Sequence, residues 1–248
     1  MLLSIITVCF NAEKTIERTF KSVLNQTYRA FEYLIIDGDS KDKTIDIINR
    51  WKEKFASTEI TFKVISEKDN GLYNAMNKGA RNANGDFILY LNADDELASD
   101  DSIVNFIDNL KNSDDVLYGN TIIVDKTESQ EARKALPANK ITKHLPFIPQ
   151  SAFVRTSVQR KFPFNEQYRI TADYDSFLRM YLAGKNFRYV DYYYSKFYVG
   201  GISNEDEWLT YKEDIKVKHN NGILNKYSLI QQIKYFRRYL SIRYGGKS

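Results

Sequence analysis

The 248-residue sequence is poor in the residues that build disulfide-linked, zinc-binding and membrane-spanning proteins. A single cysteine, Cys9, excludes an internal disulfide and is typical of a reducing compartment. Because it ends an apolar run, we expect a small core residue rather than a nucleophile. His144 and His219 are far apart and near no cysteine pair, which argues against a zinc site.

Membrane spans and common nucleotide motifs are also missing. The first residues lack the basic segment of a signal peptide, and their apolar stretch is too short to cross a bilayer. We therefore expect a cytoplasmic protein. Neither GxxxxGK[ST] nor GxGxxG occurs, so the sequence supports neither a P-loop NTPase nor a dinucleotide-binding fold.

Acidic residues are absent after Asp214, although the chain as a whole carries 36 basic and 32 acidic residues. The eight basic residues beyond Asp214 are Lys216, Lys218, Lys226, Lys234, Arg237, Arg238, Arg243 and Lys247. Without them, 28 basic residues face 32 acids, so the body has a net charge of −4 and the tail produces the overall +4. This asymmetry favours an anionic surface as partner of the tail.

An amphipathic helix is predicted within the tail, from 228 to 244. Its apolar residues recur at steps of four, three and four, and they are Leu229, Ile233, Phe236 and Leu240. Beside the neighbouring cations, such a stripe can lie on an anionic membrane. The alternative is that it packs on the rest of the chain or on a second subunit.

The first hundred residues alternate between predicted strands and helices. Strands are expected at 2–9, 31–36, 60–65 and 87–91, and helices follow the first three, with Asn11 a candidate cap for the first helix. The expected second and third helices cover 43–51 and 72–83. This alternation predicts βαβ units and a parallel sheet.

The second half is less regular. Strands are predicted at 116–119, 121–124, 187–190 and 196–199, an extended segment at 146–154, and helices at 173–183 and from about 205. Gly184 is expected to end the helix that begins at Asp173. The charged segment 126–140 is predicted to be a mobile loop.

Acidic residues follow two of the predicted strands directly. The apolar run 87–91 reads as a strand buried on both faces, and Asn92, Ala93, Asp94, Asp95 and Glu96 come next. Ligands of open α/β sheets bind outside the carboxyl ends of strands, where Mg²⁺ or Mn²⁺ would relieve the repulsion between acids. Asp37 ends another strand, and together these positions favour a nucleotide site. The alternative is an acidic turn before a helix starting at Ser99 or Asp100.

Five segments, in order, resemble glycosyltransferase family 2, which comprises inverting sugar-nucleotide enzymes of GT-A fold. They are SIITVCFNAEKTIERTFKSVLNQTY, IIDGDSKDKT, EKDNGLYNAMNKGARNANGDFILYLNADDEL, QSAFVR and TADYDSFLR. The resemblance covers roughly the first 200 residues. It implies an α/β fold with a Rossmann-like, mostly parallel sheet flanked by helices. We expect a GT-A domain over 1–204, divided into a nucleotide-binding half (1–98) and an acceptor half (99–204). A basic amphipathic helical extension is expected over 205–248.

The resemblance also implies site residues. Those expected at the nucleotide-sugar are Thr7, Asn11, Asp37, Asp39, Ser40, Asp69, Asn77, Asn92, Ala93 and Asp94. Asp94 would also hold Mg²⁺ or Mn²⁺, Asp95 and Gln150 would lie on the acceptor side, and Asp173 would be the catalytic base. For Asp39 a solvated turn is the alternative. Two positions depart from the family pattern: Asn92 replaces the first acid of the DxD motif, and Pro149 stands where relatives often have His.

The implied activity is inverting transfer of a sugar from a nucleotide-sugar, expected to be a UDP-sugar, in surface polysaccharide biosynthesis. The expected acceptor is a saccharide, free or on a polyprenyl diphosphate at the inner face of the plasma membrane, and no nucleic-acid partner is expected. A sugar-nucleotide-synthesising nucleotidyltransferase would need a Gly-rich, basic loop near the first strand, which is absent. The remaining alternative is a non-catalytic sugar-nucleotide-binding component of a polysaccharide assembly complex, which would have no use for a base at Asp173.

Overall fold

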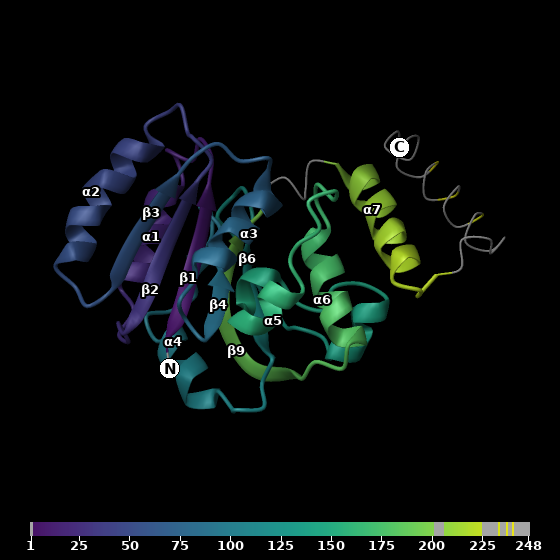
Figure 1. The fold of residues 1–248 in the computed structure, drawn as a ribbon. Helices are drawn as coiled ribbons and strands as arrows, with labels where there is room; N and C mark the ends of the chain where they lie inside the picture. Colours follow the sequence, from purple (N-terminus) through teal and green to yellow (C-terminus); the bar gives the residue numbers. More distant parts are fainter. Residues whose placement is uncertain (1, 201–205, 225–232, 234–236, 238–239, 241–248) are drawn as a thin grey trace.

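A nine-stranded sheet with helices on both faces forms the body of the protein (Figure 1). The computed structural model describes residues 2–200, 206–224, 233, 237 and 240. The strands are β1 (Leu3–Cys9), β2 (Phe31–Asp37), β3 (Thr61–Ser66), β4 (Phe87–Tyr90), β5 (Glu96–Leu97), β6 (Val116–Val124), β7 (Gln130–Arg133), β8 (Ala152–Arg155) and β9 (Phe187–Tyr198). The α-helices are α1 (Ile16–Leu24), α2 (Thr44–Ala56), α3 (Leu72–Asn82), α4 (Ser102–Asn109), α5 (Thr156–Lys161), α6 (Ala172–Leu182) and α7 (Glu207–Asn220). Two 3₁₀ helices are η1 (Ala138–Thr142) and η2 (Pro149–Ser151).

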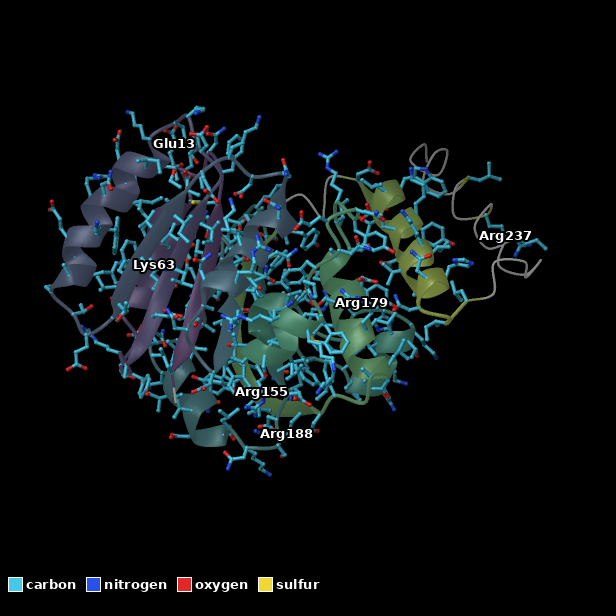
Figure 2. All side chains as sticks on the ribbon, in the orientation of Figure 1. Glu13, Lys63, Arg155, Arg179, Arg188 and Arg237 are labelled. Atoms are coloured by element: carbon cyan, nitrogen blue, oxygen red, sulfur yellow. The ribbon has the colours of Figure 1, made fainter. Side chains whose placement is uncertain are left out.

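The first four strands are parallel, as the sequence predicts. The sheet order is β3-β2-β1-β4-β8-β6-β9-β5, with β7 paired to β6. Strand β8 joins β4 in the antiparallel sense, and β6 and β9 are parallel to each other. The carboxyl ends of β1, β2, β3 and β4 therefore lie along one side of the sheet, which we call the carboxyl edge. Glu13, just past β1, lies near this edge, whereas Arg155 and Arg188 lie at the opposite end of the molecule (Figure 2).

Alternate residues of the central strands enter two separate cores. Ile6 and Val8 of β1 pack with residues of α3, α5 and α6, whereas Leu3 and Ile5 pack with residues of α1, α2 and α4. Residues 87–91 are all nearly inaccessible to water, which confirms the prediction of a strand buried on both faces. Phe20 of α1 centres the second core, where it contacts the rings of Tyr33, Trp51, Phe55 and Phe62.

Three predictions for the second half are wrong in their connectivity. Residues 116–124 form one strand, β6, with an irregularity around Gly119 rather than two strands. Residues 187–198 likewise form one long strand, β9, because it continues across the same irregularity. Segment 126–140 contains β7 and the start of η1 instead of being only a loop, since β7 pairs with the end of β6.

The described part of the C-terminal extension packs on the acceptor half. Helix α7 lies beside α6 at the end of the molecule opposite α2 (Figure 1). Val217 of α7 is fully buried in the core that contains α6, and Ile223 packs against that core. Of the predicted tail helix only Ile233, Arg237 and Leu240 are described; they are helical, and all three are exposed. The rest of that prediction lies outside the described residues. Among the described helices, none is long and apolar enough to cross a membrane.

Candidate active site

The loop that follows β2 is organised around the carboxylate of Asp37. This side chain is fully buried, and its Oδ1 accepts a hydrogen bond from the Ser40 hydroxyl at 2.5 Å. Its Oδ2 accepts from the Ser66 hydroxyl at 2.7 Å and from the Asp39 amide at 3.1 Å. The carboxylate thus joins the carboxyl ends of β2 and β3 and shapes the loop, because its oxygens are engaged by protein donors.

Asn11 braces the same loop from β1 and does not cap α1. Its backbone φ of +51° turns the chain, its amide donates to Ser40 Oγ at 2.8 Å, and its Oδ1 accepts from the Lys41 amide at 2.8 Å. The predicted cap is therefore wrong, since α1 begins only at Ile16, after Thr15. Asp39, at φ +67°, has a half-exposed side chain that pairs with Lys41 at 2.6 Å.

Asp69 lies against this loop. Its carboxylate pairs with Lys78 of α3, and a Cβ built on Gly38 would lie 3.2 Å from its Oδ2. Cys9 is buried beside them, with Sγ 3.6 Å from Asp37 Oδ1. Burial and the Asp37 charge raise the pKa of the Cys9 thiol, so it stays protonated, as the prediction of a core cysteine requires.

A second group of polar side chains follows β4 and carries oxygens without protein partners. Within the described residues, the buried atoms Asn92 Oδ1 and Asp95 Oδ2 accept no hydrogen bond, and neither does Gln150 Oε1 of η2. Buried polar atoms are nearly always paired, so these oxygens indicate a place where a ligand or water supplies the donor. Asp94 is only half-buried, and burial raises the pKa of its carboxyl while the nearby Arg18 opposes the shift.

Arg18 and Tyr198 are site residues that sequence reasoning missed. The Arg18 guanidinium lies 4.0 Å from the centre of the Tyr198 ring; burial raises the pKa values of Asp94 and Asp95, and the Arg18 charge partly opposes that rise. The Tyr198 amide donates to Asp95 Oδ1 at 3.1 Å. Arg18 lies within the first segment that resembles the family, but nothing there marks it as a site residue except that it is a cation on the helix after the first strand, and Tyr198 lies in none of the five segments.

Asp173 lies in the first turn of α6, as predicted. Its Oδ1 accepts from the Tyr174 amide at 2.7 Å and lies 3.3 Å from the hydroxyl of Tyr73, near the start of α3. Burial raises the pKa of this carboxyl to about 6, despite these two donors. At neutral pH the group is ionised yet close to its pKa, which suits a general base.

Tyr73 links Asp173 to the carboxyl edge, because Tyr73 lies at the start of α3, which follows the carboxyl end of β3. The Phe164 ring lies 5.2 Å from that of Tyr90, the last residue of β4, and 5.4 Å from that of Tyr73. The segment that leads into α6 therefore crosses the end of β4 and the beginning of α3. Asp173 and the acids that follow β4 belong to the same side of the sheet.

Two residues expected at the donor have other partners. Thr7 is fully buried, and its hydroxyl bonds to the Leu91 carbonyl at 2.6 Å and to the Tyr33 hydroxyl at 2.9 Å. The side-chain amide of Asn77 donates from Nδ2 to the Phe164 carbonyl and accepts at Oδ1 from the Phe164 backbone amide, both at 2.9 Å. The structure thus does not bring these two side chains to the donor loop, because both are satisfied inside the fold. Ala93 is buried.

Asp94 is the candidate metal ligand that fits the donor chemistry. The described residues contain no group of three or more His, Cys, Asp or Glu side chains that could hold an ion alone. Mg²⁺ and related hard cations often need only one or two carboxylates when substrate phosphates complete the coordination. The partly exposed carboxylate of Asp94, beside the unpartnered Asn92 oxygen, meets that requirement.

The fold and the arrangement of this site define a glycosyltransferase of GT-A fold. The chain belongs to glycosyl transferase family 2, whose family model matches residues 4–184. It is 29% identical over 211 residues to a PGL/p-HBAD biosynthesis glycosyltransferase of Mycobacterium bovis, covering 82% of this chain and 79% of the relative. It is 34% identical over 131 residues to an uncharacterized glycosyltransferase of Haemophilus influenzae, covering 52% of this chain and 50% of the relative.

Solved structures share the fold at low sequence identity. S. aureus TarS 1-349 in complex with UDP-GlcNAc has a TM-score of 0.68 and 17% identity, covering 97% of this chain and 73% of that one. The mannosyltransferase PcManGT from Pyrobaculum calidifontis, in complex with GDP-Man and Mn²⁺, has a TM-score of 0.68 and 13% identity, covering 98% and 70%. The predicted family and GT-A fold are thereby confirmed.

Proposed function

We propose that the protein transfers a sugar from a UDP-sugar to a saccharide acceptor, free or on a polyprenyl diphosphate, with inversion at the anomeric carbon. The observation that carries this proposal is Asp173: a mostly buried carboxylate with a pKa of about 6, at the carboxyl edge that holds the donor-side acids. A protein that only binds sugar nucleotides has no need of such a group. We further propose a role in surface polysaccharide biosynthesis at the inner face of the plasma membrane.

The reaction requires one base. An acceptor hydroxyl attacks the anomeric carbon while the nucleoside diphosphate leaves, and the carboxylate of Asp173 takes the hydroxyl proton. Direct displacement inverts the configuration and needs no second carboxylate as nucleophile. The Tyr174 amide, which donates to Asp173 Oδ1 at 2.7 Å, orients the carboxylate, and the Tyr73 hydroxyl lies 3.3 Å from the same oxygen.

The donor is expected along the loop after β2 and the end of β4. The rigid loop built by Asn11, Asp37 and Ser40 would receive the nucleoside, with Asp39 and Asp69 beside it. Asn92 and Asp94 would face the diphosphate, with Mg²⁺ or Mn²⁺ held by Asp94. When bound, such a cation neutralises the charge that builds on the leaving diphosphate. Asp95 Oδ2 and Gln150 Oε1, which lack partners within the described residues, would accept hydrogen bonds from sugar hydroxyls toward the acceptor side.

A ligand screen followed by one variant tests this proposal. UDP-GlcNAc, UDP-glucose, UDP-galactose and GDP-mannose are each added with Mn²⁺, and the melting temperature is measured. A ligand at about a hundred times its dissociation constant stabilises the protein by about 2.7 kcal/mol. We expect a UDP-sugar to give the largest shift and to be hydrolysed slowly to UDP.

Asp173→Asn is then expected to keep donor affinity, measured by calorimetry, while the rate of UDP release falls by about 10²- to 10⁴-fold, as is typical when a general base is lost. Near-normal release by Asp173→Asn would remove Asp173 from the reaction. Tight binding of a UDP-sugar with no release from the wild type, with or without added saccharides, would favour the non-catalytic binder.

A further inference from the structure

A buried carboxylate on α7, outside the site described above, gathers three successive backbone amides. Glu213 is 8% exposed, and its Oε1 accepts from the Arg169 amide at 2.8 Å. Its Oε2 accepts from the amides of Ile170 at 2.9 Å and Thr171 at 3.1 Å. Hydrogen bonds to an ionised acceptor are about twice as strong as neutral ones, so this carboxylate holds the segment firmly.

The segment that Glu213 holds leads directly into the turn that carries Asp173. Thr171 is the N-cap residue of α6, yet its own side chain makes no capping hydrogen bond. The Ile170 carbonyl accepts from the hydroxyl of Tyr73, the same hydroxyl that approaches Asp173. The residues that Glu213 contacts therefore lie between α7 and the Tyr73 hydroxyl.

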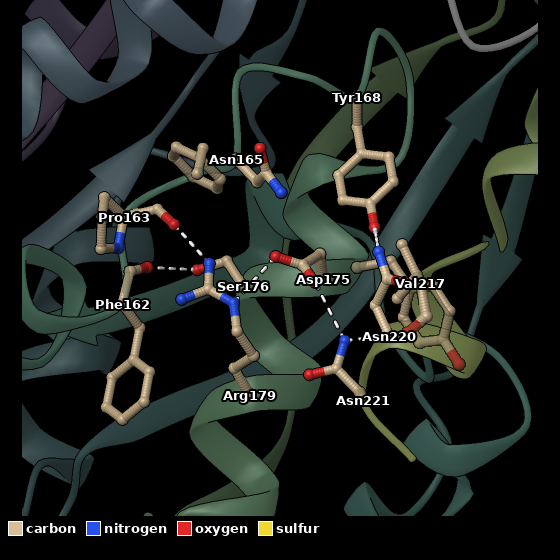
Figure 3. A network of polar contacts seen from close by, with 12 residues as sticks. Phe162, Pro163, Asn165, Tyr168, Asp175, Ser176, Arg179, Val217, Asn220 and Asn221 are labelled. Carbon is tan, nitrogen blue, oxygen red and sulfur yellow. Dashed lines mark hydrogen bonds and ion pairs between the residues drawn. The ribbon is translucent and has the colours of Figure 1, made fainter. Parts of the chain in front are cut away.

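Helix α7 is itself tied to α6 and to the segment before it (Figure 3). The side-chain amide of Asn221, just past α7, donates to Asp175 Oδ1 at 3.0 Å. Asp175 also pairs with Arg179 at 2.8 Å. The side-chain amide of Asn220 donates to the Tyr168 hydroxyl at 2.9 Å. With these contacts and the buried Val217 side chain, α7 is a fixed support from which Glu213 can act.

We propose that Glu213 is a positioning residue for catalysis: it holds 169–171 so that the Asp173 carboxylate meets the acceptor hydroxyl in the reactive geometry. This inference rests on the proposed role of Asp173 as base. A misplacement of about 1 Å in an active site can cost about 10²-fold in rate. We also infer that the catalytic domain extends through α7 to Leu224, beyond the boundary at 204 that the sequence suggested.

Glu213→Gln is the variant that tests the proposal. Glutamine has the same shape, but its NH₂ group cannot accept a hydrogen bond from a backbone amide. We expect UDP release from the donor identified by the screen to fall about 10- to 100-fold in kcat, with KM for that donor and the calorimetric affinity for UDP changed less than about twofold. Amide hydrogen exchange at 169–171 is expected to speed up in the same variant.

A matched control is Glu32→Gln at the opposite end of the sheet. Glu32 is also buried and also accepts from backbone amides, those of Asn84 and Gly85, together with the Ser4 hydroxyl. It therefore reports what a purely structural carboxylate contributes. We expect this change to lower the melting temperature while kcat stays within about twofold of the wild-type value. An equal loss of kcat in both variants would overturn the positioning role.

Further measurements separate this inference from the proposed function. If Glu213→Gln does not fold, Glu213→Asp keeps the charge on a shorter side chain and is expected to retain protection of the three amides with a reduced kcat. A carbon-13 titration of the Asp173 carboxyl reports its surroundings even if no donor is turned over. That carboxyl faces Tyr73 of α3, Tyr174 of α6 and Asp214 of α7, with Lys218 beyond Asp214. An unchanged titration and unchanged exchange in Glu213→Gln would overturn the proposal, whereas inactivity of the wild type alone would count only against the proposed function.

Discussion

Carboxylates at the carboxyl edge differ in how their oxygens are used. The oxygens of Asp37 are engaged by hydroxyl and amide donors of its own loop, so this side chain shapes the site. Asp95 keeps one buried oxygen without a partner, and Asp94 remains partly exposed. The free oxygens follow β4, which is where a ligand or a cation would complete the hydrogen bonding or the charge balance.

Asp94→Asn is expected to leave the fold intact and to remove most of the transfer activity, because it replaces the only acid in the Asn92-Ala93-Asp94 triplet by an amide. The measurement is UDP release as a function of Mn²⁺ concentration, with Asp46→Asn on the exposed face of α2 as the control. Retained activity with an unchanged Mn²⁺ dependence would move the metal to another group, and Asp95 would be the next to test.

The stability of the protein should report the raised pKa of Asp173. The folded-state pKa of about 6 lies above the ordinary 3.8, so the folded protein keeps a proton that the unfolded chain releases between these values. This carboxyl's contribution to stability is therefore full below about pH 4 and is lost as the pH rises through 6. Asp173→Asn carries no charge and escapes that loss.

We expect Asp173→Asn to gain about 1 kcal/mol of unfolding free energy relative to wild type when the pH is raised from 5 to 7.5. Urea denaturation of both proteins at the two pH values measures this difference. If the difference in unfolding free energy between the two proteins is the same at both pH values, the carboxyl is not desolvated in the folded protein.

At the scale of elements, α3 lies unusually close to β1. A Cβ built on Gly79 would lie 2.6 Å from Cγ2 of Ile6, which is fully buried. Glycine is therefore needed here for close packing, although it weakens the helix by about 1 kcal/mol relative to alanine. The close approach holds Tyr73 and Asp69–Lys78 near the ends of the strands.

Gly79→Ala is expected to lower the unfolding free energy by about 1–2 kcal/mol, because overpacking a core outweighs the gain in helix propensity. Denaturant unfolding measures the loss. In the double variant Ile6→Ala/Gly79→Ala the two changes should cost less than their sum, since the contacted methyl group is gone. Strict additivity would show that the helix shifts freely instead.

Sequence patterns predicted the elements of the first half well and those of the second half poorly. Strands β1, β2 and β4 coincide with largely apolar, buried runs, whereas β3 mixes polar and apolar residues; each is joined to the next by a helix, so local patterns are sufficient. Strand β7 has a polar sequence and is exposed, and it exists because it pairs with β6. No periodic pattern in the chain signals such a pairing.

At the scale of the whole molecule, membrane binding by the basic tail is a separate proposal. Residues Ile233 and Leu240 of the predicted apolar stripe are 48% and 38% exposed. We propose that the tail binds an anionic membrane surface, where each cation near the lipids contributes about 1 kcal/mol. This would bring the enzyme to an acceptor held at the membrane by its polyprenyl chain.

Full-length protein is expected to sediment with vesicles that contain phosphatidylglycerol at low salt and to be released at high salt. Replacement of Lys234, Arg237, Arg238 and Arg243 by glutamine should abolish sedimentation, and a chain ending at Asn225 should stay folded and still hydrolyse donor, because it keeps α7 and Ile223. If vesicles bind all three proteins equally, or if the shortened chain unfolds, the tail serves packing or assembly instead.

The sequence by itself determined the family, the parallel strands and the positions of Asp37, Asp94 and Asp173, because these depend on contiguous motifs and on the rule that ligands bind at strand ends. Only the tertiary structure decided which side chains do other work. Thr7 and Asn77 have the residue types of a binding site, but their side chains form hydrogen bonds inside the fold.

Arg18 and Glu213 show the converse. Arg18 partly opposes the rise in the pKa values of Asp94 and Asp95, which lie more than seventy positions away. Glu213 accepts hydrogen bonds from Arg169, Ile170 and Thr171, which lie 42 to 44 positions before it. Contacts of this range arise when separate elements pack together, and no local pattern in the sequence marks either residue for such a contact. Only the folded chain therefore shows the contacts from which we propose that α7 supports the proposed catalytic base.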